Sequence, residues 1–170
     1  MKYQAVIIDI DMTLVDSSAT EHHRRQRNWP LVYSMIPQYG LHPDIPLLIS
    51  ELQSQGMKIA IVSSSPRPYC ERILTHFKFP YSVLVAYHDT QMHKPNSQPF
   101  MKALSLIQID PSKCISLGDD VKDVLAAKAS GLAINIGCTW HVDNSTDLVS
   151  NGADFIARKP LDVIDIINKA

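Results

Sequence analysis

The sequence predicts an α/β fold, in which helices cover both faces of a doubly wound parallel sheet of about five strands. Short apolar segments alternate along the chain with segments whose apolar residues recur every three or four positions, as on one side of a helix. The chain has 170 residues, of which 45% are hydrophobic, so it can bury the core of one ordinary domain. We therefore expect a single domain over residues 1–170.

Five short segments rich in β-branched residues are the predicted strands. They are Tyr3–Ile10, Lys58–Val62, Ser82–Ala86, Cys114–Leu117 and Leu132–Ile136. Their nearly continuous apolar character is typical of strands that are buried on both faces, and this favours a parallel sheet.

Amphipathic segments between these strands predict the helices. They lie around Ile45–Leu52, Arg67–Lys78, Phe100–Ile107, Val121–Ser130 and Pro160–Asn168. One stretch interrupts the alternation, because a polar, basic segment followed by apolar and aromatic residues separates the first strand from the first of these helices. We expect residues 17–42 to form a small cap insertion.

Charge and composition exclude several classes of protein. Sixteen Lys and Arg against 17 Asp and Glu give a formal charge of −1, so no basic field favours general nucleic-acid binding. The apolar runs fall far short of the roughly 20 residues that span a bilayer, so we expect no membrane partner and no signal peptide. The three cysteines lack metal-ligand spacing, so we expect buried free thiols and a cytoplasmic protein.

Polar residues lie at or after the ends of four of the predicted strands. They are Asp9, Asp11 and Thr13; Ser63 and Ser64; Lys94; and Gly118, Asp119, Asp120 and Asp123. Ligands bind at the carboxyl ends of strands in open α/β sheets, so we expect these side chains to share one crevice. Several carboxylates repel one another unless they share a cation, and oxygen ligands favour Mg²⁺. A lysine and a serine hydroxyl suit a phosphate group.

These residues form four motifs in chain order. The motifs are Asp9-x-Asp11-x-Thr13, an apolar strand leading to Ser63, Lys94-Pro95, and Gly118-Asp119-x-x-x-Asp123. Together they resemble the motifs of the haloacid dehalogenase superfamily of phosphohydrolases. Many members have Gly where this chain has Met12, so the turn after the first strand must form without a residue that readily takes positive φ.

The resemblance implies a role for each residue. Asp9 would be the nucleophile that forms an aspartyl-phosphate, and Asp11 the general acid and base. The phosphate-binding residues would be Ser63, Ser64 and Lys94. The Mg²⁺ site would include Asp9, Asp11, Asp119 and Asp123. The residues that support these two groups would be Thr13, Gly118 and Asp120. Either Asp120 or Asp123 could be the second metal ligand beside Asp119, and the resemblance favours Asp123.

The resulting hypothesis is a Mg²⁺-dependent phosphatase that acts on a phosphorylated small molecule or a phosphate-ended substrate. Two alternatives stay open: a phosphotransferase or mutase that uses the same aspartyl-phosphate, and a non-catalytic phosphoacceptor or binding module. A short cap encloses a pocket poorly, so the substrate is large or a second subunit completes the site, which makes a homo-oligomer possible. Arg24, Arg25 and Arg27 either meet an anionic substrate or form a solvated helix face.

Overall fold

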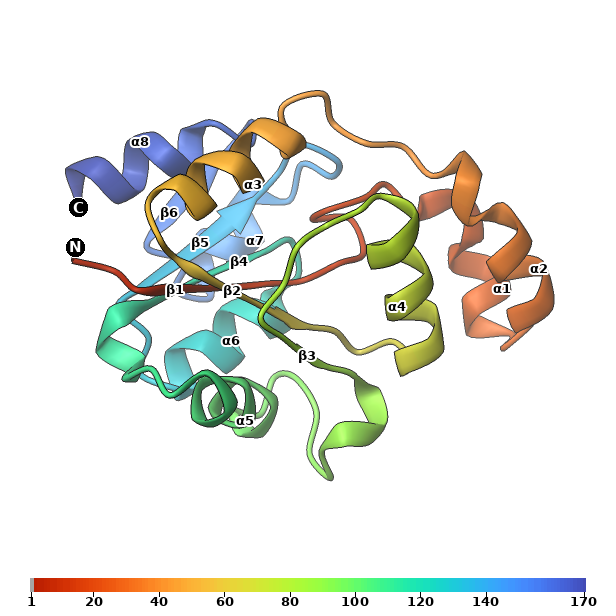
Figure 1. Cartoon of the computed structure of the whole chain (residues 1–170), viewed down its shortest axis with the longest axis horizontal. Helices are drawn as coiled ribbons and strands as arrows, with labels where there is room; N and C mark the ends of the chain where they lie inside the picture. The colour runs from red at the N-terminus through yellow and green to blue at the C-terminus, as the bar shows by residue number, and fades with distance from the viewer. Residues whose placement is uncertain (1) are drawn as a thin grey trace.

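The computed structural model describes residues 2–170, and a six-stranded sheet lies at its centre (Figure 1). The strands are β1 (Ala5–Ile8), β2 (Lys58–Val62), β3 (Val83–Val85), β4 (Cys114–Gly118), β5 (Ile134–Cys138) and β6 (Phe155–Ala157). Their order is β3-β2-β1-β4-β5-β6, and every neighbouring pair is parallel. The predicted α/β fold with a parallel sheet is confirmed.

The sheet has one strand more than the five predicted. The additional strand, β6, has three residues and pairs only with β5 at the edge of the sheet. Phe155 is exposed and only Ala157 is fully buried. The three apolar residues of β6 are fewer than the run of about four to eight that predicts a buried strand.

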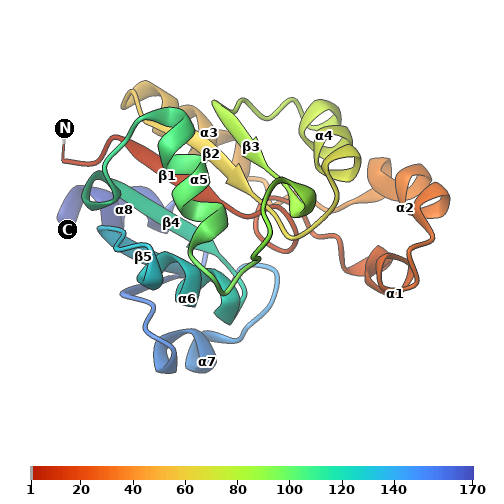
Figure 2. The same cartoon turned by 90° about the horizontal axis from the view of Figure 1, so that it is seen from below.

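Helices cover both faces of the sheet (Figures 1 and 2). Side chains alternate between the faces along β1, so Val6 and Ile8 belong to one hydrophobic cluster, and Ala5 and Ile7 to the other. The first cluster includes residues of α3 (Ile45–Ser54), α4 (Arg67–His76) and α8 (Asp162–Lys169). The second includes residues of α5 (Gln98–Ile107) and α6 (Val121–Ala129). Cys70, Cys114 and Cys138 are buried free thiols, as predicted.

A further short helix, α7 (Ser145–Ser150), was not predicted. It packs beside β5 and β6, and Leu148 is its one buried residue. A six-residue helix with a single buried side chain does not produce a recognisable apolar stripe. No helix within residues 2–170 combines the length and the apolar character that crossing a bilayer requires.

The segment 17–42 forms short helical turns next to α4 (Figure 1). It contains two 3-10 turns, Ser18–Thr20 and Ile36–Gln38, and two helices, α1 (Glu21–Arg25) and α2 (Trp29–Met35). Figures 1 and 2 place α1 and α2 at the end of the molecule opposite to the two chain termini. Val32 and Ile36 join the hydrophobic core, whereas α1 buries none of its residues. This segment is therefore anchored through α2 and the turn that follows it rather than through α1.

Candidate active site

The strand register places the predicted motifs at one edge of the sheet. Ile8, the last residue of β1, lies opposite Ile61 of β2 and Leu117 of β4. The residues that follow these positions therefore lie next to one another, with Asp9 between the ends of β2 and β4. The backbone N–H of Asp9 continues the pairing by donating to the carbonyl of Leu117 at 3.1 Å.

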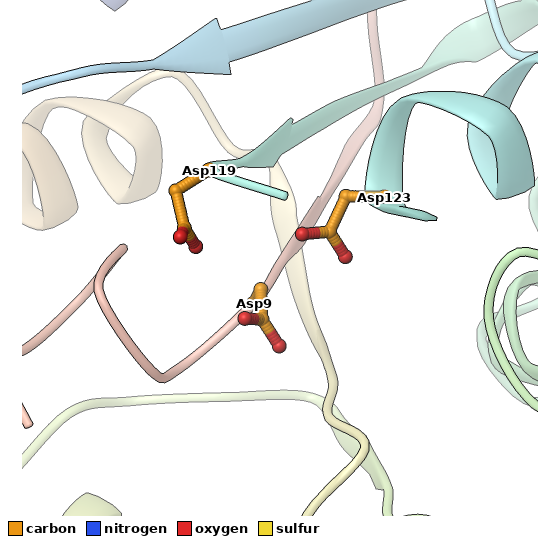
Figure 3. Close-up of side chains that lie close together, drawn as sticks. All are labelled: Asp9, Asp119 and Asp123. Atoms are coloured by element: carbon orange, nitrogen blue, oxygen red, sulfur yellow. The ribbon is translucent and has the colours of Figure 1, made fainter. Parts of the chain in front are cut away.

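Asp9, Asp119 and Asp123 form a cluster, which we call the carboxylate cluster. One carboxylate oxygen from each lies within 4.8 Å of the other two, and Figure 3 shows the side chains pointing into a common space. Gly118 is what allows Asp123 to approach β4 so closely. A Cβ at position 118 would lie 2.6 Å from Cβ, Cγ and Oδ2 of Asp123, far inside van der Waals contact. The glycine is therefore required by packing.

Lys94 lies against the carboxylate cluster. Its ammonium nitrogen donates to Oδ1 of Asp9 at 2.8 Å, to Oδ1 of Asp123 at 2.6 Å and to the carbonyl of Val62 at 3.2 Å. Only 5% of the lysine side chain is exposed. Burial favours the neutral amine, but Asp123 and Asp9 together raise the pKa of Lys94 above its usual value. The lysine is therefore a permanent positive charge inside the site.

One ammonium does not balance three carboxylates. Burial raises the pKa of Asp9 well above its ordinary value, and Asp123 and Asp119 add to this effect while Lys94 opposes it. Burial and the charge of Asp123 raise the pKa of Asp119 to about 7, although the hydrogen bond from Thr13 lowers it in part. Three converging carboxylates whose oxygens lie within 4.8 Å of one another are a suitable donor set for a hard divalent cation. The cluster fits a metal site.

Thr13 connects the loop after β1 to the carboxylate cluster. Its buried hydroxyl donates to Oδ1 of Asp119 at 2.9 Å, and its carbonyl accepts from the indole N–H of Trp140 at 2.9 Å. The side-chain amide of Asn144 donates to the carbonyl of Asp119 at 2.6 Å. The sequence did not predict the contacts of Trp140 and Asn144, because nothing in the local sequence indicates either of them.

Met12 forms the turn after β1 in the left-handed region, with a φ of 59°. A non-glycine residue there is strained, and backbone hydrogen bonds hold the conformation. The N–H of Met12 donates to the carbonyl of Val15 at 2.8 Å, and the N–H groups of Leu14 and Val15 both donate to Ile10. The chain thus forms this turn without the glycine that is common in the superfamily.

The carboxylate of Asp11 is occupied by other side chains. Oδ1 accepts from the hydroxyls of Ser17 and Tyr69, both at 2.6 Å, and lies 2.7 Å from a terminal nitrogen of Arg24. Oδ2 accepts from the hydroxyl of Ser65 at 2.9 Å. The carboxylate cluster does not include Asp11, so the structure does not place this side chain among the metal ligands as predicted. Tyr69 was missed because its contact depends on how α4 packs.

Asp120 caps α6 and lies outside the carboxylate cluster. Its side chain accepts from the backbone N–H of Lys122 at 2.8 Å, and Asp123 accepts from the N–H of Asp120 at 3.3 Å. This reciprocal arrangement is a capping box, which satisfies N–H groups in the first turn of the helix. Asp123 therefore takes part in both the cap and the carboxylate cluster.

A cavity of about 850 Å³ opens beside these groups. Asp9, Ser63, Ser64 and Lys94 line it together with Asp119. Ser63 is buried, and its hydroxyl accepts the backbone N–H of Ser65 at 3.1 Å, whereas Ser64 is exposed at the cavity surface. The predicted phosphate-binding residues therefore share one cavity with the carboxylate cluster.

Residues of the segment 17–42 also line this cavity. They include Arg24, Arg25, Arg27 and Trp29. The three arginines differ in their partners, because Arg24 pairs with Asp11, and Arg25 pairs with Glu21 on its own helix. Arg27 is exposed. The basic stretch is thus neither a uniform anion-binding surface nor a merely solvated helix face.

Comparison with known proteins agrees with this geometry. Residues 33–135 match a family model described as "Haloacid dehalogenase-like hydrolase". The chain belongs to the haloacid dehalogenase-like hydrolase family. The matched part of this haloacid dehalogenase-like chain contains Ser63, Lys94, Asp119 and Asp123, while Asp9 precedes it.

Two curated relatives match more than two thirds of this haloacid dehalogenase-like chain. It is 29% identical over 121 residues to the pyrophosphatase PpaX of Bacillus pumilus. It is 28% identical over 131 residues to the N-acetylmuramic acid 6-phosphate phosphatase of Pseudomonas aeruginosa. These matches cover 68% and 74% of this chain, but 54% and 57% of the two relatives. The chain thus spans little more than half of their length.

A solved structure shares the whole fold. It is a haloacid dehalogenase-like family hydrolase from Streptococcus pneumoniae, which superposes with a TM-score of 0.83 at 20% identity. The alignment covers 98% of this chain and 99% of the other. At this identity the likeness concerns the fold alone.

Proposed function

We propose that this protein is a Mg²⁺-dependent phosphatase that hydrolyses a phosphomonoester through an aspartyl-phosphate on Asp9. The observation that carries the proposal is the position of Asp9 on the cavity wall, beside the Lys94 ammonium and within the carboxylate cluster. A carboxylate can attack a phosphoryl group only where positive charge offsets the charge on both reactants. Relatives named as a pyrophosphatase and a phosphatase support this choice.

The residues around the cavity have complementary roles in this proposal. Ser63, Ser64 and Lys94 bind the phosphoryl oxygens and orient the phosphorus toward Asp9. A carboxylate oxygen of Asp9 forms the bond to phosphorus as the ester P–O bond breaks, and the leaving oxygen takes a proton from Asp11. Water then attacks the phosphorus, Asp11 accepts its proton, and phosphate leaves as Asp9 is restored.

Asp9, Asp119 and Asp123 would hold the magnesium ion in this proposal. When bound, Mg²⁺ supplies positive charge to the phosphoryl oxygens and to the carboxylates. Thr13, Trp140 and Asn144 would keep Asp119 in place, and Gly118 would leave the space that Asp123 requires.

Residues 17–42 act as a small cap in this proposal, within a single domain. Two observations support that role: Arg24 and Trp29 of this segment line the cavity, and Arg24 pairs with Asp11. The cap is short, and the cavity of about 850 Å³ is much larger than a phosphate group. We therefore propose a phosphorylated organic molecule, or a larger phosphate-ended substrate, as the occupant.

A phosphate-release assay tests the proposed function. The panel contains phosphorylated metabolites, nucleotides, pyrophosphate and phosphate-ended oligonucleotides, each with Mg²⁺ and with excess chelator. We expect Mg²⁺-dependent phosphate release from at least one phosphomonoester, and its loss in Asp119→Asn. Absence of release from the whole panel, or undiminished release by metal-stripped protein, would contradict the proposal. Phosphate transferred to an added sugar instead of to water would identify a phosphotransferase.

A further inference from the structure

Oδ1 of Asp11 has no free position for a substrate atom in the arrangement that the structure shows. A carboxylate offers about four acceptor positions. Three hydroxyls, from Ser17, Ser65 and Tyr69, donate to it at 2.6 to 2.9 Å, and Arg24 lies 2.7 Å from Oδ1. An acid and base must be within hydrogen-bond reach of the oxygen that it protonates. Ser65 alone contacts Oδ2, so it is Oδ1 that requires one of its three partners to leave before a substrate atom can reach it.

Three of the four partners of Asp11 are held in place by the core. Tyr69 and Ser17 are completely buried and Ser65 nearly so. The hydroxyl of Tyr69 lies 3.2 Å from that of Tyr39, which in turn contacts the hydroxyl of Thr20. Moving any of them would disturb buried hydrogen bonds, whose loss destabilises a protein.

Arg24 is the partner that can leave. It belongs to α1, a five-residue helix that buries none of its residues. Its guanidinium touches Asp11 through one terminal nitrogen and Ser17 through the other, at 3.1 Å, while its buried Nε has no hydrogen-bond partner within residues 2–170. Arg24 thus makes a single contact with the Asp11 carboxylate, whereas a planar guanidinium can bind a carboxylate or phosphate through two parallel hydrogen bonds.

Arg24 also faces the place where a substrate would lie. It lines the same cavity as Asp9 and Asp11, and 16% of its side chain is exposed. A substrate whose leaving group carries an anion could offer Arg24 the bidentate partner that Asp11 does not provide. The same contact would release one acceptor position on Asp11.

We propose that Arg24 determines specificity by exchanging Asp11 for a second anionic group on the substrate, so that the enzyme prefers phosphate esters whose leaving group carries a carboxylate or another phosphate. The inference rests on the proposed phosphatase function and adds a substrate class to it. Because the exchange frees a position on Oδ1 of Asp11 for the leaving oxygen, the anionic group raises kcat as well as lowering KM. An anion that merely improved binding would change KM alone.

Matched substrates test the exchange. The probes are ω-phosphoryloxy carboxylates of increasing chain length, each paired with its methyl amide, which has the same leaving oxygen and no charge. We expect at least one carboxylate to exceed its amide by about tenfold or more in kcat/KM, with part of the gain in kcat. Equal rates at every chain length, or a gain confined to KM, would overturn the inference.

Variants then assign the preference to Arg24. In Arg24→Gln the carboxylate-to-amide ratio should fall to near one, and Arg24→Lys should restore part of it, since the charge returns without the planar fork. Arg158→Gln removes an exposed arginine outside the cavity and should keep the wild-type ratio. A purely structural role would lower both rates and leave the ratio unchanged in Arg24→Gln, which would overturn the inference. If Arg24→Gln does not fold, the ratio in Arg24→Lys decides.

The two proposals fail in different ways. Release of phosphate from both members of a pair at equal rates would overturn only the role of Arg24. Release from neither member, together with no release from the wider panel, would overturn the phosphatase function itself.

Discussion

The ammonium nitrogen of Lys94 lies 2.6 Å from Oδ1 of Asp123, a residue 29 positions later in the chain. Side-chain exposure is 5% for Lys94 and 4% for Asp123, so this ion pair is almost completely removed from water. Removal of one partner of a buried ion pair leaves the other charge uncompensated and typically costs about 3–5 kcal/mol. The pair therefore joins the loop after β3 to the start of α6.

Replacement of Lys94 by Met should destabilise the metal-free protein by about 3–5 kcal/mol, because Asp9 and Asp123 lose their cation. Urea unfolding measures the difference. Lys113→Met removes an exposed lysine and should change the unfolding free energy by no more than about 0.5 kcal/mol. An unchanged stability in Lys94→Met would mean that the buried ion pair does not exist in solution.

Gly118→Ala should weaken Mg²⁺ binding without unfolding the protein. The new Cβ would lie 2.6 Å from three atoms of Asp123, so the carboxylate must move. We expect the dissociation constant for Mg²⁺, measured by calorimetry, to rise about tenfold or more, as displaced metal-site geometry usually causes. Ser116→Ala, on the same strand, should leave it unchanged. Equal affinity for Gly118→Ala and wild type would remove Asp123 from the proposed metal site.

Replacement of Asp120 should change stability, whereas replacement of Asp123 should change Mg²⁺ binding. Asp120→Ala removes the N-cap of α6 and should cost about 1 kcal/mol of stability while Mg²⁺ affinity stays at the wild-type value. Asp123→Ala should abolish Mg²⁺ binding. Loss of Mg²⁺ binding in Asp120→Ala, with retention in Asp123→Ala, would reverse the assignment of the second ligand.

Magnesium affinity should rise as pH increases through about 7. Burial and Asp123 raise the pKa of Asp119 to about 7, so this carboxylate must lose a proton before it binds metal. In the metal-free folded protein Asp119 binds its proton more tightly than in the unfolded chain, so the unfolding free energy decreases as pH rises from about 4 to about 7. The increase in Tm caused by Mg²⁺ should therefore be larger at about pH 8 than at about pH 6. An equal or smaller increase at the higher pH would contradict the raised pKa.

The fold and the carboxylate cluster were largely predictable because both are encoded locally. Buried parallel strands are continuous apolar runs, and β2 has the predicted bounds, Lys58–Val62. Asp9 and Asp119 follow such runs directly, so their proximity follows from the edge that the strand ends share. Edge strand β6 could not be predicted, because a segment of three residues, two of them not fully buried, is too short to be recognised as a strand from its sequence.

The surroundings of Asp11 depend on packing between segments and could not be predicted. Tyr69 reaches Asp11 only because α4 packs beside the loop after β1, and nothing in the sequence around Tyr69 indicates this contact. Arg24 was marked only as part of a basic stretch, yet its partner is a carboxylate 13 positions earlier. Asn144 supports Asp119 from a loop whose local sequence suggests no contact.

Replacement of Asp9 by Asn tests the central claim most directly, because the amide keeps the shape of the side chain but cannot act as the nucleophile. With the best substrate from the panel and saturating Mg²⁺, we expect Asp9→Asn to release phosphate at less than about one thousandth of the wild-type rate, with an unchanged circular dichroism spectrum. Asp120→Asn, which changes an exposed carboxylate near the cavity, serves as the control for protein handling. Retention of more than a few per cent of the wild-type rate by folded Asp9→Asn would contradict an aspartyl-phosphate on Asp9.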